Sequence, residues 1–294
     1  MRPNNIFKGL GVALVTPFQA DGRVDFEALE NLVNSQIEGK TDFLCVLGTT
    51  AETPCLSIEE KREILKFVVN LVDKRLPILL GCGSNNTNEV IRYLHEEDLS
   101  GVDGVLIVTP YYNKPSQEGL YQHFSAVAKA TQLPVVLYNV PGRTGVNLQA
   151  STTLRIAADN NNVVAIKEAS GIITQIEDIV AHAPKGFEVL SGDDAITLEL
   201  LTIGGAGVIS VVGNAYPVEF GDMVHKALSG DFTEALKAHR RFNGIYKAMC
   251  VDGNPAGVKA LLSVQGKILN KLRLPLVPAR TETIENISEM VSDF

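Results

Sequence analysis

Apolar runs of strand length recur along the first 214 residues and alternate with segments of helical periodicity. The eight runs are GVALVTPF (11–18), DFLCVLGTT (42–50), PILLGCG (77–83), GVLIVTPYY (104–112), PVVLYNVPG (134–142), NVVAIKEAS (162–170), FEVLSGDD (187–194) and AGVISVVGN (206–214). Most of them are apolar nearly throughout instead of alternating with polar residues. Such runs are typical of strands that are covered on both faces, as in a parallel sheet.

The segments between these runs carry helix signals. In residues 25–39 the apolar positions are spaced close to one face of a helix; they are Phe26, Leu29, Leu32, Val33 and Ile37. The segment 57–73 opens with Ser57 and has Glu60 three residues later, which is the pattern of a capping box. Eight strand-then-helix units in one domain predict an α/β protein with a (β/α)8 TIM barrel over residues 1–230.

The strand patterns end near residue 230, and residues 231–294 are predicted to form a C-terminal helical region. No linker or low-complexity segment separates this region from the barrel. A doubly wound sheet is the alternative fold, and it would usually carry a glycine-rich phosphate-binding turn. The segments GLGVAL (9–14) and GCGSNN (81–86) match such a turn poorly, so the barrel is favoured.

Composition and charge restrict the function classes. Of the 294 residues, 45% are hydrophobic and 20% are charged, which is typical of a globular domain with a substantial core. The net charge of −8 and the absence of a Lys/Arg run argue against nucleic acid or an anionic membrane as a partner. The apolar stretch within residues 1–18 is too short to span a bilayer and lacks a signal-peptide cleavage region, so a cytoplasmic location is expected.

The cysteines and histidines give no sign of a disulfide framework or a metal site. Cys45, Cys55, Cys82 and Cys250 form no CxxC pair and are predicted to be reduced thiols, mostly in the core. The five histidines are scattered, and none falls at a strand end; they are His95, His123, His182, His225 and His239. No spacing typical of zinc ligands is visible.

Polar residues gather at the predicted carboxyl ends of the strands, where the active sites of such barrels lie. They are Thr16, Gly48, Thr49, Thr50, Gly81, Gly83, Thr109, Tyr111, Tyr112, Tyr138, Arg143, Lys167, Ser191, Asp193 and Ser210. The strand beginnings carry mainly Val, Leu and Ile. Asp193 and its neighbour Asp194 should project to different sides, and we expect them to be loop or cap residues. The sequence therefore predicts a site at one rim of the barrel.

Lys167 follows the apolar run of residues 163–166. Because strand side chains alternate, it should share a face with Val163 and Ala165, whereas Ile166 and Glu168 point the other way. Desolvation would disfavour the ammonium form and make a neutral amine available as a nucleophile. The alternative is a lysine that snorkels to water at a strand end.

Tyr138 stands at the end of the preceding predicted strand, as Lys167 does in its own strand: an apolar run is followed by one polar residue at the rim. A phenol beside a lysine can transfer protons as a carbonyl becomes a carbinolamine and then an imine. A packed aromatic ring with a hydrated hydroxyl is the alternative. Arg143, in PGRTG (141–145), can bind a carboxylate with its planar guanidinium or can be a surface-loop arginine. GTT (48–50) offers hydroxyls and backbone N–H groups that suit a small carboxylate, or it is a plain turn.

Five motifs occur in the order GTTAE, VTPYYNKPSQEGLYQHF, YNVPGRTG, AIKEASG and GVISV. With them the chain resembles the dihydrodipicolinate synthases along essentially its whole length. AIKEASG alone is typical of the wider family of pyruvate-handling Schiff-base lyases and aldolases. YNVPGRTG together with GTT narrows the resemblance to the synthases, because the sialic acid lyases typically lack the arginine loop and carry a serine in the GTT position.

The resemblance implies a 4-hydroxy-tetrahydrodipicolinate synthase that condenses pyruvate with L-aspartate 4-semialdehyde, the first committed step of diaminopimelate and lysine biosynthesis. By resemblance, Lys167 forms the imine with pyruvate. Tyr138, Thr49 and Tyr112 would relay protons, with Tyr112 supplied by a neighbouring subunit. No metal or organic cofactor is implied, and the partner is a second copy of the chain, typically in a homotetramer built as a dimer of dimers.

Further residues are assigned to substrate binding by the same resemblance. Thr50 and the backbone at Gly48 would hold the pyruvate carboxylate. Arg143 would hold the carboxylate of the semialdehyde, and the backbone at Ile209 would line the pocket.

Two stretches depart from the family pattern. The usual GES after GTT is replaced by Ala51, Glu52 and Thr53. If position 51 requires a positive φ, alanine would change the turn. The second departure concerns feedback inhibition by lysine, which some family members show.

Residues Asn85, Glu89 and Tyr111 match the family's lysine-contacting positions. A histidine of lysine-sensitive members is replaced within residues 58–61, where Lys61 could repel the effector. Weak or altered inhibition is therefore expected, although a solvated helix face accounts equally well for SIEEKRE (57–63).

Two other functions stay open from the sequence. The first is a sister aldolase, of the N-acetylneuraminate lyase or keto-deoxy-sugar-acid aldolase type, with the same imine and another acceptor. The second is a non-catalytic barrel that binds a metabolite. Lys167, Tyr138, Thr49 and Arg143 together argue against the second, because a polar rim of this kind is what catalysis requires.

Overall fold

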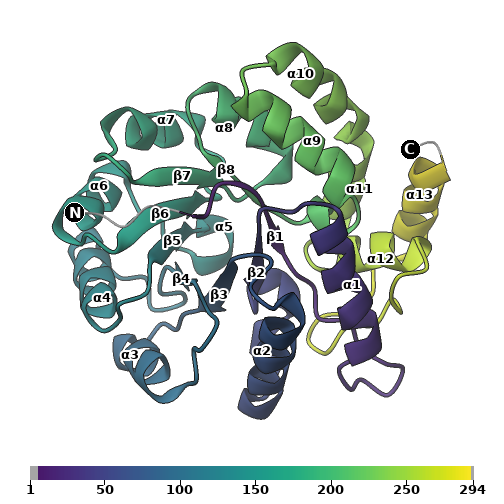
Figure 1. Cartoon of the computed structure of the whole chain (residues 1–294), viewed down its shortest axis with the longest axis horizontal. Helices are drawn as coiled ribbons and strands as arrows, with labels where there is room; N and C mark the ends of the chain where they lie inside the picture. The colour runs from purple at the N-terminus through teal and green to yellow at the C-terminus, as the bar shows by residue number, and fades with distance from the viewer. Residues whose placement is uncertain (1–5, 293–294) are drawn as a thin grey trace.

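Eight parallel strands close into a barrel in chain order in the computed structural model, which describes residues 6–292 (Figure 1). The strands are β1 (Gly9–Ala13), β2 (Phe43–Val46), β3 (Ile78–Cys82), β4 (Gly104–Val108), β5 (Val135–Asn139), β6 (Val163–Glu168), β7 (Glu188–Ser191) and β8 (Gly207–Ser210). β8 pairs with β1 and completes the barrel. The predicted (β/α)8 barrel is therefore confirmed, and each predicted apolar run contains at least part of a strand.

Helices follow the strands and surround the barrel (Figure 1). They are α1 (Phe26–Glu38), α2 (Ile58–Val72), α3 (Thr87–Glu96), α4 (Gln117–Lys129), α6 (Ala150–Asp159), α7 (Ile173–His182), α8 (Thr197–Thr202) and α9 (Pro217–Leu228), with a short additional helix α5 (Pro141–Thr144) after β5. Short 3-10 turns lie at the rim: η1 (Thr49–Ala51), η2 (Thr53–Cys55), η3 (Asp194–Ile196) and η4 (Val212–Asn214). The predicted capping box begins α2, because Ser57 and Glu60 each bond the other's backbone N–H.

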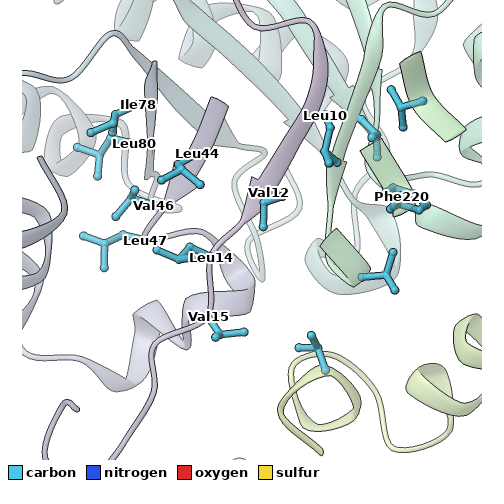
Figure 2. Packing of buried hydrophobic residues seen from close by; sticks show 14 of the residues in the cluster. Leu10, Val12, Leu14, Val15, Leu44, Val46, Leu47, Ile78, Leu80 and Phe220 are labelled. Carbon is cyan, nitrogen blue, oxygen red and sulfur yellow. The ribbon is translucent and has the colours of Figure 1, made fainter. Parts of the chain in front are cut away.

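The strands are apolar nearly throughout because both of their faces are covered. The outer face packs on the helices; Figure 2 shows Leu10 and Val12 of β1 in this cluster with Leu44 and Val46 of β2. The inner face fills the barrel with a second cluster, in which the rings of Phe7 and Phe43 lie 5.3 Å apart. The barrel interior is therefore filled with side chains. The carboxyl ends of the strands form the rim at which the candidate site lies.

A β-bulge interrupts the alternation of β6. The register runs Val135 to Val163 and then Val136 to Ala165, so Val164 is an extra residue in β6. Val163 lies in the outer cluster, whereas Val164 and Ala165 both lie in the inner one. The prediction that Val163 shares a face with Lys167 is therefore wrong, because a bulge shifts the facing of every residue on one side of it.

After α9 the described chain continues with α10 (Phe232–Arg241), α11 (Asn243–Val251), α12 (Ala256–Val264) and α13 (Thr281–Ser292), and residues 265–280 between α12 and α13 are not helical. α10 packs on α9, and α13 packs on α11 and α12. The division into a barrel of residues 1–230 and a helical region of residues 231–294 stays a prediction, and its first five and last two residues lie outside the described part.

Within residues 6–292, none of the helices has the length and apolar character needed to cross a membrane. The cytoplasmic location stays a prediction, and residues 1–5 of the N-terminal stretch on which it rests are not described.

Candidate active site

Lys167 and Tyr138 lie side by side at the rim because β5 and β6 pair them in register. The Nζ atom of Lys167 is 4.5 Å from the centroid of the Tyr138 ring. The two residues are only 5% and 6% exposed, respectively. Lys167 is thus enclosed in the barrel mouth, which contradicts the alternative of a lysine that snorkels to water.

Two small residues from other parts of the barrel, Cys45 and Gly192, lie near Lys167. Cys45 of β2 lies in the inner cluster, and burial raises the pKa of its thiol to about 11 while the nearby Lys167 charge acts in the opposite direction. Gly192 follows β7, and a Cβ atom there would lie 3.1 Å from Cε of Lys167 and 2.7 Å from Cβ of Ala169. Gly192 is a site residue that the sequence reasoning missed, although it stands directly after an apolar strand.

Glu168 is directed away from Lys167, as predicted. Its carboxylate accepts hydrogen bonds from Asn139 Nδ2 on β5, from Gln175 Nε2 on α7 and from the backbone N–H of Ser170. Burial raises the pKa of Glu168, and the bonds from Ser170 and Asn139 counteract this effect. These hydrogen bonds connect the end of β6 with β5 and α7. They also keep the Glu168 carboxylate away from the Lys167 amine.

The GTT segment forms the turn η1 after β2. Thr50 is buried, and its hydroxyl accepts a hydrogen bond of 3.0 Å from Asn254 Nδ2; Thr49 is half-buried. Ala51 lies inside the 3-10 turn without a positive φ, and Glu52 is the residue with a left-handed backbone, at φ 56°. The condition under which an alanine at position 51 would change the turn is therefore not met.

Arg143 stands on α5, with its side chain exposed at the rim. Its guanidinium donates a hydrogen bond of 2.9 Å to the backbone carbonyl of Asn254. Asn254 thus contacts both Thr50 and Arg143, the two residues predicted to hold substrate carboxylates. It was missed from the sequence because it lies in the C-terminal region, immediately before α12, more than one hundred positions after Arg143.

The loop after β4 presents its two tyrosines to the outside. Tyr111 is exposed, and Tyr112 is 88% exposed with a left-handed backbone at φ 72°. The backbone N–H of Tyr112 donates to the carbonyl of Thr144, which ties this loop to α5. Within one chain, therefore, the Tyr112 side chain is not packed into the barrel mouth with Lys167.

The residues predicted to bind lysine are only partly brought together. Glu89 lines a cavity of about 490 Å³ together with Ile58 and Lys61. Burial lowers the pKa of Lys61. Asn85 and Tyr111 are outside this lining, although the Asn85 carbonyl accepts a hydrogen bond from Asn113, two residues after Tyr111.

The strand ends of β7 and β8 close the rest of the rim. Ile209 lies in the inner cluster near the end of β8. Asp193 caps η3, as expected, and the carboxylate of Asp194 accepts hydrogen bonds from the backbone N–H groups of Val211 and Val212. Burial raises the pKa of Asp194 to about 6. Both acids therefore shape the loops after β7 and β8. Across the described residues, no three His, Cys, Asp or Glu side chains are grouped as metal ligands would be.

The sequence model of the dihydrodipicolinate synthetase family matches residues 6–294. The chain belongs to this family. The 4-hydroxy-tetrahydrodipicolinate synthase of Phocaeicola vulgatus is 58% identical to it over 287 residues, which are 98% of this chain and 97% of the relative. The dihydrodipicolinate synthase structure from Thermotoga maritima superimposes with a TM-score of 0.96 at 43% identity, covering 98% and 99% of the two chains.

A chloride-inhibited dihydrodipicolinate synthase from Acinetobacter baumannii, solved with pyruvate, gives a TM-score of 0.95 at 38% identity and covers 98% of this chain and 99% of its own. The resemblance seen in the sequence motifs is thus confirmed, because the family model and these solved structures match nearly the whole length of the chain. The chain is an enzyme of this family, as predicted.

Proposed function

We propose that the chain is a 4-hydroxy-tetrahydrodipicolinate synthase that condenses pyruvate with L-aspartate 4-semialdehyde through an imine on Lys167. The observation that carries the proposal is the enclosed pair of Lys167 and Tyr138 at the rim, with Nζ 4.5 Å from the centre of the phenol ring. An amine that is held in a closed mouth beside a proton donor suits attack on a ketone. Family membership supports the same reaction.

The reaction begins with the neutral Lys167 amine. Nζ attacks the keto carbon of pyruvate, and the carbinolamine loses water after its hydroxyl is protonated, which gives the imine. Loss of a methyl proton moves the electron pair into the C–C bond and forms the enamine. The enamine carbon bonds to the aldehyde carbon of the second substrate, and the resulting alkoxide takes up a proton. The amino group of that substrate then attacks the imine carbon and displaces Lys167, which closes the ring and frees the enzyme.

The proton transfers belong to Tyr138, Thr49 and Tyr112. Tyr138 is the residue beside Lys167 and would protonate the departing hydroxyl. The 88% exposure of Tyr112 supports its role in trans, because a side chain that stands away from its own barrel is free to enter the mouth of a partner's. The proposal therefore includes a homo-oligomer, a dimer as the minimum and a tetramer of two dimers as the full assembly.

Two positions accept the substrate carboxylates. Thr50 and the backbone at Gly48 would hold pyruvate close to Lys167, and Ile209 would line the same end of the pocket. Arg143 would hold the carboxylate of the semialdehyde, since its guanidinium is exposed at the rim and can bind both oxygens at once. The Asn254 contacts to Thr50 and Arg143 keep these two positions at a fixed separation.

Lysine binding is proposed for the cavity beside Glu89. Its carboxylate could pair with the ammonium of a lysine effector, whereas Lys61 on the same lining would oppose it. Weak inhibition follows from these two opposed charges. Titration of activity with L-lysine, in wild type and in Lys61→His, tests this part; equal inhibition of both would contradict it.

Reduction with borohydride in the presence of pyruvate tests the proposed function. Mass spectrometry of peptides should find the reduced pyruvate adduct on Lys167, and prior addition of the semialdehyde should discharge it. Lys167→Met should abolish the adduct, whereas Lys129→Met, at an exposed position on α4, should leave it unchanged. An adduct that the semialdehyde cannot discharge would assign the chain to a sister aldolase. No adduct in the wild type would overturn the imine itself.

A further inference from the structure

A buried ion pair lies behind the GTT turn. Glu52 follows η1, Lys259 lies on α12, and their carboxylate and ammonium are in direct contact with neither side chain accessible to solvent. Lys259 Nζ also donates to the backbone carbonyl of Lys271 at 2.9 Å and stands 4.1 Å from the centroid of the Phe18 ring. The second carboxylate oxygen of Glu52 accepts from the backbone N–H of Arg273 at 3.0 Å.

The pair is not explained by stability alone. Removing two charges from water is costly, and apolar side chains of similar size often serve a core equally well or better. Burial lowers the pKa of Lys259 to about 8 although Glu52 acts in the opposite direction, so desolvation outweighs the attraction. The other charged or titratable groups that act on Lys259 are Arg273, which faces the same Phe18 ring, and Cys55. A positional effect of the pair on the neighbouring backbone is therefore the next question.

The geometry concerned is that of η1. Glu52 has a left-handed backbone at φ 56° and ψ 34°, which residues with a β-carbon adopt at a cost. Its backbone N–H donates to the carbonyl of Thr49 and so closes the turn. The contact with Lys259 anchors the Glu52 side chain next to this turn. Asn254, five residues before Lys259, makes a second contact with the turn, because its Nδ2 donates a hydrogen bond to the Thr50 hydroxyl.

We propose that the Glu52–Lys259 ion pair is a positioning device, which fixes the Thr49–Ala51 turn in the geometry that receives the carboxylate of pyruvate. The inference rests on the proposed function, since it assigns that carboxylate to Thr50. Neither residue touches the substrate. Their effect passes through the turn that carries Thr49 and Thr50, while Lys167 and Tyr138 stay in place on their strands. It is therefore expected mainly in the binding of pyruvate, together with a slower proton transfer at Thr49.

Steady-state kinetics separate this role from a purely structural one. In Glu52→Gln and in Lys259→Met, KM for pyruvate should rise about tenfold while KM for the semialdehyde stays within about twofold. The double variant carries no unpaired buried charge, so it should regain thermal stability but not the KM for pyruvate. It also replaces the single variants if these do not fold. Val68→Ala, in the buried face of α2, is the control that lowers stability without touching the turn. Equal changes of both KM values, or an unchanged KM for pyruvate, would overturn the proposal.

Hydrogen exchange gives a readout that needs no substrate. The backbone N–H groups of Ala51 and Glu52 donate to the carbonyls of Gly48 and Thr49, and they should exchange about tenfold faster in Glu52→Gln than in the wild type or Val68→Ala. Unchanged exchange at these two groups would also overturn the positioning role. A wild type that forms no pyruvate adduct would instead overturn the proposed function, whatever the exchange rates are.

Discussion

The Nζ atom of Lys167 lies over the face of the Tyr138 ring, 4.5 Å from its centroid, because β5 and β6 end in register. The ring therefore has two separable effects on Lys167. Its face packs against the amine, and its hydroxyl is the group that can transfer a proton. Substitutions at Tyr138 can remove the second effect and keep the first.

Tyr138→Phe should accordingly keep the fold and slow the chemistry. The ring still packs beside Lys167, so the melting temperature should change little. Loss of the proton donor should lower kcat by about 100-fold or more, since a positioned acid or base contributes on this scale. Rapid-quench trapping with borohydride measures the rate of imine formation directly. An unchanged trapping rate would show that another group protonates the carbinolamine.

Gly192→Ala tests the space beside the Lys167 stem. The new methyl group would lie 2.7 Å from Cβ of Ala169 and 3.1 Å from Cε of Lys167, so the segment around Ala169 must shift and the lysine stem must give way slightly. We expect the yield of pyruvate adduct to fall about tenfold or more, because small displacements of a nucleophile are costly in rate. Gly119→Ala on α4, where the nearest atom would be Pro115 Cβ at 3.2 Å, is the matched control and should keep the wild-type yield.

Arg143→Ala should separate the two substrates. Removal of the guanidinium proposed to bind the carboxylate should lower kcat/KM for the semialdehyde by about 100-fold, while the adduct with pyruvate still forms on Lys167. Arg155→Ala removes an exposed guanidinium from α6 and serves as the control. Undiminished use of the semialdehyde by Arg143→Ala would show that Arg143 does not hold the carboxylate of this substrate.

The positions of the main residues of the candidate site could be predicted from the sequence because they follow local rules. An apolar run that ends in Lys167, and a neighbouring run that ends in Tyr138, place both side chains at the rim through strand pairing alone. The bulge at Val164 could not be predicted in this way, because it exists only in the register between β5 and β6.

Long-range contacts could not be predicted from the sequence either. Asn254 and Lys259 reach the GTT turn from the C-terminal region, and nothing in their local pattern indicates which loop they contact. The role of Gly192 depends on the position of the Lys167 side chain on another strand. Sequence patterns thus predicted which residues lie at the rim, and tertiary contacts determine what holds them there.

The end of the barrel opposite the site carries a pH-dependent pair that gives a further prediction. His225 Nε2 on α9 lies 2.7 Å from the Asp42 carboxylate, which also accepts from the backbone N–H of Leu10 at the start of β1. The bond to Asp42 raises the pKa of His225, with Asp222 acting in the same direction. Because the folded-state pKa is raised, the stabilisation is complete below the unfolded value of about 6.5 and is lost as the pH rises through the folded value.

His225→Gln should therefore lower the melting temperature more at pH 6 than at pH 9. Thermal unfolding of wild type and variant at both pH values measures this difference, and added salt should reduce it because both side chains are partly exposed. His182→Gln is the control for an exposed histidine on α7. If the melting temperatures of wild type and His225→Gln differ by the same amount at both pH values, the ring stabilises the barrel by packing and not through its charge. Packing of the imidazole does not depend on its protonation.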